Sequence, residues 1–283
     1  MKKENKKLKY NIIVVTLMTL VLMLVGLLIG DILFSVIASI PMGAEKEEAL
    51  SNYLPFVGVI GVVVLFSGLT DVEILKKYFK CSGKKAPIMV AFGLLIGLAM
   101  NVICVLPAII SGNLQLQSGN MTAAWGVITL LAVFIQASAE ELLSRGYMFQ
   151  YLYKRYGLVI AGVVSSVFFA VMHIFNDGVT VLALVNIVLI GLFYTSSVVC
   201  LDNLWFAMAA HAGWNFCQSF IIGLPNSGIP ATLSFWSIQN VQQGMFYDTK
   251  FGVESTIVTA IVYLIGIVTL LIIKRKRCLN MPI

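Results

Sequence analysis

The stretch ASAEELLSRGYMF, residues 137–149, places two adjacent carboxylates and an arginine inside one of the most apolar parts of the chain. At the centre of a bilayer, a charged side chain costs roughly 2.5 to 3.5 kcal/mol on the insertion scale. Glu140, Glu141 and Arg145 therefore indicate either mutual pairing or a site with confined water. Which of these holds depends first on whether the chain spans a membrane.

The composition is that of an integral membrane protein. Of the 283 residues, 59% are hydrophobic and only 11% are charged, and the mean hydropathy is +0.95. An ordinary soluble domain carries about 25% charged residues. The net charge of +6 does not indicate nucleic acid as a partner, because the lysines and arginines cluster at the ends of apolar runs, where they act as topology signals. The expected partner is the lipid bilayer.

The lengths of the apolar runs predict the fold class. A transmembrane helix needs about 20 apolar residues, and on this basis we expect an all-α, polytopic membrane helical bundle of about eight transmembrane helices. The expected segments are 11–37, 53–70, 87–110, 122–152, 158–175, 179–200, 204–222 and 254–273.

Loop charges predict the orientation. With eight spans, the basic clusters fall on one side of the membrane, and the three loops 44–52, 111–120 and 223–253 fall on the other, as the positive-inside rule requires. We therefore predict a multi-pass cell-membrane protein with both termini cytoplasmic, and its compact chain with short loops is typical of a bacterial plasma-membrane protein. The basic clusters are the N-terminal lysines, Lys76 to Lys85, Lys154-Arg155 and the KRKR run at 274–277.

Helix lengths predict that a carboxylate and an imidazole meet. The fourth and fifth segments form a hairpin that turns near Tyr156-Gly157. Glu140 lies 17 residues before Gly157 and His173 lies 16 residues after it. Two straight antiparallel helices would place these side chains at the same height.

The other histidine has a polar neighbour on its own helix. His211 and Asn215 are one helical turn apart and share a face. They lie level with Glu140, in the cytoplasmic half of the membrane, if the hairpin at residues 156–157 protrudes roughly 10 Å further into the cytoplasm than the turn at residues 202–203. Ionisable residues inside a membrane indicate function. The alternative is that each of the two histidines in the chain is a core residue bonded to a backbone carbonyl.

The two glutamates are expected to do different work. Glu141 and Arg145 have the i to i+4 spacing, with the acid first, that favours a helical ion pair. Glu140 points about 100° away and is left free to face the histidines. The alternative is that both glutamates only satisfy Arg145.

The chemistry of this set indicates hydrolysis. A carboxylate beside imidazoles can activate water as a general base, while histidine and asparagine can stabilise the oxyanion that forms when water attacks a carbonyl. Two imidazoles and a carboxylate can also bind catalytic zinc with one position open, although no HExxH motif is present. We predict hydrolysis of a peptide bond by activated water. No cofactor other than a potential zinc is expected.

At these residues the sequence resembles the CAAX prenyl endopeptidase and bacteriocin-processing (CPBP) family of intramembrane proteases, also called the ABI family. The family pattern is EExxxR, then FxxxH, then HxxxN, on successive membrane helices. The resemblance covers about residues 122–222 and uses both histidines of the chain. The motifs read Glu140-Glu141-Leu-Leu-Ser-Arg145, Phe169-Ala-Val-Met-His173 and His211-Ala-Gly-Trp-Asn215.

The resemblance implies an all-helical core with a cavity open to the cytoplasm and a glutamate-dependent endopeptidase. Glu140 would be the general base with His173 beside it, and His211 and Asn215 would polarise the scissile carbonyl and hold the oxyanion. Supporting roles fall to three further residues of the motifs, which are Glu141, Arg145 and Phe169.

The resemblance leaves the metal and the substrate open. Glu140, His173 and His211 would be metal ligands only if zinc is bound. The substrate class is a membrane-associated peptide, a lipoprotein or a prenylated CAAX-like protein. The expected parts of the chain are residues 1–121 with helices one to three, the core at 122–222, and residues 223–283 with an extracytoplasmic loop, a final helix and a basic cytoplasmic tail.

Two other functions fit a bundle of this kind. A non-catalytic bacteriocin self-immunity or scaffold protein would bind a peptide without cutting it, but it has no need for the full set of acid, base and oxyanion groups. A proton-coupled transporter could use the same residues as a relay. Such proteins often show inverted repeats, and the sequence contains no symmetry of that kind.

Overall fold

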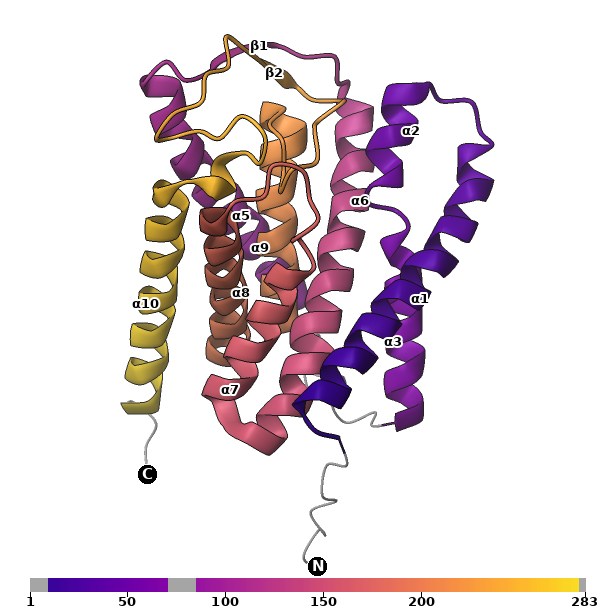
Figure 1. Cartoon of the computed structure of the whole chain (residues 1–283), viewed down its shortest axis with the longest axis vertical. Helices are drawn as coiled ribbons and strands as arrows, with labels where there is room; N and C mark the ends of the chain where they lie inside the picture. Colours follow the sequence, from indigo (N-terminus) through magenta and orange to yellow (C-terminus); the bar gives the residue numbers. More distant parts are fainter. Residues whose placement is uncertain (1–9, 71–84, 280–283) are drawn as a thin grey trace, which may run out of the picture.

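The computed structural model describes residues 10–70 and 85–279 as a mostly helical bundle (Figure 1). Within that part of the chain, six helical stretches are long and apolar enough to cross a membrane. The protein is therefore a polytopic helical membrane protein. The basic clusters in residues 1–9 and 71–84 lie outside the described residues. The six stretches are Ile12–Ala38, Ala44–Leu69, Ala86–Ile110, Ala123–Val171, Val181–Leu201 and Ile257–Lys276.

The difference between eight expected spans and six candidates has two physical causes. Segments 122–152 and 158–175 lie in one helical stretch, Ala123–Val171, and segment 204–222 is not among the candidates because His211, Asn215 and Gln218 lower its hydropathy. In addition, the stretch 44–52, which we expected to be a loop, contains helix α2 (Ala44–Ser51).

The N-terminal helices form a closely packed pair. Helix α1 (Ile12–Ala38) begins after Asn11, whose side chain accepts a hydrogen bond from the Val14 amide, and packs against α3 (Phe56–Thr70). Added side chains at Gly30 and Gly58 would collide with the backbone of the facing segment, so small residues allow this close approach. The opposite face of α1 exposes a row of apolar side chains suited to lipid: Leu17, Val21, Leu24, Leu28 and Ile32.

A long stretch from α6 (Ala123–Glu141) through the π-helical segment η1 (Leu142–Met148) to α7 (Phe149–Val171) forms the expected hairpin. At 1.5 Å per residue a straight helix of this length would be about 74 Å long, more than twice the hydrocarbon core. The chain turns at Gly157, whose φ of 79° suits glycine. Figure 1 shows α6 descending and α7 returning beside it.

The hairpin ends earlier than expected. Helix α7 stops at Val171, so His173 lies in the turn that follows instead of inside a helix reaching residue 175. The next helix, α8 (Val181–Leu201), begins after Thr180, which caps it by accepting a hydrogen bond from the Ala183 amide.

Helix α9 (Leu204–Phe216) carries His211 and Asn215 and packs along α5 (Ala86–Ile110). Side chains added at Gly97 or Gly213 would collide with the Ala210 and Leu94 carbonyls, respectively. Two glycines thus let the helices touch backbone to backbone beside the two polar residues. A second π-helical segment, η2 (Cys217–Ile222), follows α9 directly.

The expectation of an all-α fold is wrong in one small element. Strands β1 (Gln115–Ser118) and β2 (Trp236–Gln239) form an antiparallel ribbon in which Leu116 pairs with Ile238. The two loops that supply them were each expected to be irregular, and it is their mutual pairing that makes them extended. The ribbon lies at the end of the bundle opposite the start of α1 and the end of α10 (Figure 1).

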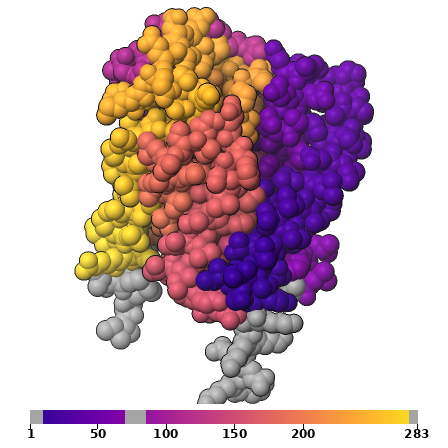
Figure 2. Space-filling view, in the orientation of Figure 1, coloured from indigo at the N-terminus to yellow at the C-terminus, as the bar shows by residue number. Residues whose placement is uncertain are grey.

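The C-terminal part closes the other side of the bundle. A short 3₁₀ turn, η3 (Val253–Ser255), leads into α10 (Ile257–Leu279), which packs on α8. Figure 2 shows the N-terminal and C-terminal helices on opposite sides, with the α7 region between them on this face. The start of α1 and the end of α10 lie at the same end of the molecule (Figure 1), and their cytoplasmic location stays a prediction.

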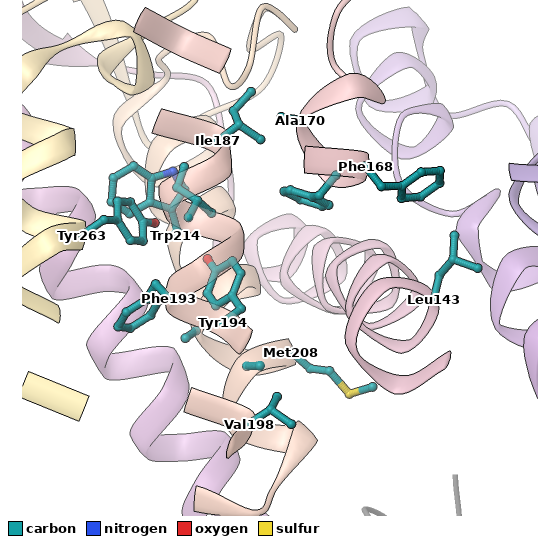
Figure 3. Packing of buried hydrophobic residues seen from close by; sticks show 14 of the residues in the cluster. Leu143, Phe168, Ala170, Ile187, Phe193, Tyr194, Val198, Met208, Trp214 and Tyr263 are labelled. Carbon is teal, nitrogen blue, oxygen red and sulfur yellow. The ribbon is translucent and has the colours of Figure 1, made fainter. Parts of the chain in front are cut away.

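Aromatic side chains fill the core between α8, α9 and α10. Figure 3 shows Trp214 and Tyr263 side by side, with Phe193 and Tyr194 next to them. The ring centroids of Trp214 and Tyr263 are 5.1 Å apart, and those of Phe193 and Tyr263 are 5.4 Å apart. This packing holds the helix that carries His211 and Asn215.

The α5–α9 contact predicts a position-specific loss of stability. Gly97→Leu should force the two helices apart and cost about 1–3 kcal/mol or more, because the added side chain meets backbone atoms. The measurement is thermal unfolding in detergent micelles. Gly61→Leu is the matched control, since a side chain there enters open space on α3. Equal losses in the two variants would contradict the interpretation.

Candidate active site

Four side chains that the sequence singled out line one cavity of about 80 Å³. Glu140 comes from α6, His173 from the turn after α7, and His211 and Asn215 from α9. The nearly equal counts of residues on either side of Gly157 therefore identified two side chains, Glu140 and His173, that share a cavity. Their catalytic roles stay a prediction.

Glu141 and Arg145 form the expected ion pair. Arg145 Nη1 donates to Glu141 Oε1 over 2.9 Å, and both side chains are fully buried. The pair spans the point where α6 widens into the π-helical η1, a distortion that is frequent at functional sites. Gly191 on α8 provides room, because an added side chain there would approach Arg145 Nη2 to 2.8 Å.

His211 lies between the two carboxylates. Its Nδ1 is 3.2 Å from Glu141 Oε1, and its Nε2 is 3.7 Å from Glu140 Oε2. A carboxylate can only accept, so Nδ1 carries the hydrogen toward Glu141. Glu141 therefore orients His211 as well as binding Arg145, a second contact that the motif spacing did not indicate. Glu140 keeps 16% of its side chain exposed and faces the cavity.

His173 meets both of the interpretations that we weighed. Its Nδ1 lies 2.8 Å from the Phe169 carbonyl one turn earlier. Because a carbonyl accepts only, Nδ1 carries the hydrogen and Nε2 remains available as an acceptor in the neutral ring. The histidine is thus bonded to the backbone and at the same time lines the cavity.

Aromatic rings hold both imidazoles in place. The Phe169 ring centroid is 5.0 Å from that of His173 and 5.9 Å, edge-on, from that of His211. Tyr194 stacks on His211 at 5.2 Å. The guanidinium carbon of Arg145 lies 4.6 Å from the centre of Phe169, a cation–π arrangement. Phe169 thus contacts three of the motif residues.

Asn215 is oriented by a residue that the sequence analysis missed. Its Nδ2 donates to Gln136 Oε1 over 3.1 Å, and both residues line the cavity. Gln136 lies one turn before Glu140 on α6, so the i to i+4 spacing could have revealed it. One N–H of the Asn215 amide is left for another acceptor.

Glu254 is a second carboxylate of the cavity, and no motif pointed to it. It is 2% exposed and accepts hydrogen bonds from Trp214 Nε1 and from both the amide and the hydroxyl of Ser227. It precedes α10 and lies outside the candidate spans. Burial raises the pKa of the Glu254 carboxyl above its usual range, while the bonds from Ser227 and Trp214 act in the opposite direction.

A second cavity of about 150 Å³ adjoins the first. The two share Glu140, Phe169 and His173, but the second extends between α1 and α7 to Met23 and Met172 and is mostly apolar. The candidate catalytic groups and an apolar chamber are therefore neighbours.

One wall of the first cavity comes from the loop between η2 and η3. Asn226, Ser227 and Ile229 of this loop line it, and β2 of the same loop lies at the end opposite the start of α1 (Figure 1). Part of this loop therefore forms a wall of the site. Access from the cytoplasm, which the resemblance implies, stays a prediction.

The donor set does not fit a metal ion as arranged. Among the residues that the structure describes, no group of three or more His, Cys, Asp or Glu side chains is placed to hold one. The Glu140, His173 and His211 set therefore does not form a metal site here, and we derive no step through zinc.

Comparison with known protein families agrees with this geometry. Residues 122–217 match the model described as type II CAAX prenyl endopeptidase Rce1-like. They form an Rce1-like domain. This range contains all three motifs and nearly coincides with the expected core at 122–222. No curated protein and no solved structure matches the chain.

The buried ion pair of the Rce1-like domain predicts different effects for neighbouring glutamates. Glu141→Gln should destabilise the fold by about 3–5 kcal/mol, because it leaves the Arg145 charge buried without its partner. Glu140→Gln should cost under about 1 kcal/mol, because that side chain faces the cavity. Denaturant unfolding in micelles measures both. A larger loss in the Glu140 variant would show that the roles are assigned the wrong way round.

Proposed function

We propose that this chain is an intramembrane endopeptidase in which Glu140 activates water to hydrolyse a peptide bond. The observation that carries the proposal is that Glu140, His173, His211 and Asn215, which all belong to the Rce1-like domain, line a single cavity. Membership of this family suggests a protease. The geometry supplies a base, an adjacent imidazole and an amide donor within one site.

The first step is attack by water. Glu140 removes a proton from a water molecule in the cavity, and the resulting hydroxide adds to the carbonyl carbon of the substrate. His173 presents Nε2 to the same cavity, since Nδ1 is bonded to the Phe169 carbonyl. It helps to hold the water by accepting a hydrogen bond.

The second step needs stabilisation of negative charge. The free N–H of Asn215 Nδ2 donates to the developing oxyanion, while Gln136 fixes the amide orientation. His211 adds a second donor from Nε2 when both of its ring nitrogens carry hydrogen. The C–N bond then breaks as the proton held by Glu140 passes to the leaving amine.

We propose a membrane-associated peptide, a lipoprotein or a prenylated CAAX-like protein as the substrate class. The apolar cavity beside Glu140 supports an apolar segment next to the cleaved bond. The alternative of a non-catalytic immunity or scaffold protein would use the same cavity for binding alone.

Cleavage predicts a dependence on single side chains. Glu140→Gln and His173→Ala should each lower product formation about 100-fold or more, because each removes a group that handles the water. Processed peptides are measured by mass spectrometry in membranes with matched expression. Glu47→Gln, an exposed glutamate on α2, is the charge-matched control and should remain active.

The binding alternative predicts another pattern. If Glu140→Gln and His173→Ala leave the peptide profile unchanged and still rescue the phenotype of deleting the protein, then the protein works without cutting. That result would replace the endopeptidase proposal with the scaffold function.

A further inference from the structure

Glu254 stands apart from the residues that the Rce1-like domain contains. It follows the matched range by 37 residues, and yet its side chain lines the same cavity as Glu140 and His211. Only 2% of the residue is exposed. A carboxylate in such a place is stable only with hydrogen-bonding partners, because burial of an unpaired charge is costly.

Both carboxylate oxygens of Glu254 are engaged. Oε1 accepts from Trp214 Nε1 over 3.1 Å, and Oε2 accepts from the Ser227 amide over 2.5 Å and from the Ser227 hydroxyl over 3.0 Å. All three partners are donors. A carboxylate therefore suits this position, since it offers two acceptors and no hydrogen of its own when ionised.

The two partners lead directly to catalytic candidates. Trp214 precedes Asn215 on α9. On the other side, the Ser227 carbonyl accepts from Asn176 Nδ2 over 2.7 Å, and the Asn176 amide donates to the His173 carbonyl over 3.1 Å. Glu254 thus connects the helix that carries Asn215 with the turn that carries His173.

Helix α8 fixes the backbone around Glu254. Asn186 is fully buried, and its Nδ2 donates to the carbonyls of Glu254 and Thr256 over 2.7 and 2.8 Å. The turn at residues 226–229 also packs closely against the segment that contains Asp177, because a side chain added at Gly228 would collide with the Asp177 carbonyl. The carboxylate is therefore held between surfaces that leave it little freedom.

We propose that Glu254 is a positioning residue of the catalytic cavity, which holds Trp214 and the turn at residues 226–229 so that Asn215 and His173 keep their places. This inference rests on the proposed endopeptidase function. Glu254 touches none of the reacting atoms and acts through its two partners. Its loss should impair the chemical step more than the stability of the fold.

The test compares Glu254→Gln with the wild type and with Glu47→Gln. The glutamine has nearly the same shape but replaces one acceptor oxygen with a donor, so that it cannot accept from both Trp214 and Ser227. We expect kcat for a labelled membrane peptide to fall about 10- to 100-fold, with KM changed less than about threefold. Glu47→Gln should retain both constants.

A second measurement reports on the loop segment that forms part of the cavity wall. Hydrogen exchange of the segment 224–232, detected by mass spectrometry on the full chain in micelles, should accelerate in Glu254→Gln and not in Glu47→Gln, because the Ser227 amide loses its acceptor. This readout does not require activity. It shows whether the carboxylate holds the turn in the folded protein.

The outcomes separate the inference from the function on which it rests. Faster exchange with an unchanged kcat would make Glu254 a structural residue only and overturn the positioning role. Unchanged exchange would overturn it as well. If instead the wild type itself releases no more product than Glu140→Gln, the endopeptidase proposal fails, and the positioning role fails with it.

Discussion

The structure depends on how one buried charge is neutralised. Arg145 is fully enclosed in the bundle, and its ion pair with Glu141 is what makes that burial tolerable. Three neighbouring residues accommodate the pair. Gly191 on α8 leaves room for the Arg145 side chain, and the Phe169 ring lies against the guanidinium. His211 on α9 contacts the Glu141 carboxylate. Four helical elements thus converge on a single interaction. Their convergence is also what brings the catalytic candidates within reach of one another.

Two neighbouring glutamates of one helix, Glu140 and Glu141, have different surroundings. Glu141 faces the protein interior and is fully buried, whereas Glu140 faces the cavity with part of its side chain open. The two side chains diverge because successive residues of a helix point about 100° apart. His211 lies near both, with its Nδ1 toward Glu141 and its Nε2 toward Glu140. The rigidity of the first contact therefore sets the geometry of the second.

Features governed by local helix geometry could be predicted from the sequence. The pairing of Glu141 with Arg145 and the shared face of His211 and Asn215 follow from 3.6 residues per turn. The turn at Gly157 follows from the conformational freedom of glycine, which allows a φ of 79°. Features that depend on contacts between segments distant in the sequence could not be predicted. The β1–β2 ribbon forms only because two separated loops meet, and Glu254 joins the cavity through packing of the C-terminal third. The eight expected spans exceed the six candidates because two of them join in one stretch and because the helical segment 204–222, which lines the polar cavity, has low hydropathy.

The residues that line the cavity therefore extend beyond the domain that the family comparison identifies. Residues 122–217 supply the Glu140 carboxylate, the two imidazoles and the Asn215 amide of the cavity. A bundle of helices alone leaves their cavity with an incomplete wall, and here the missing part comes from the 226–229 turn, anchored by a carboxylate beyond the domain. The motif residues thus form one part of the cavity, and the loop shapes the space beside them. The volume next to Glu140 is consequently set by contacts that the motifs do not encode.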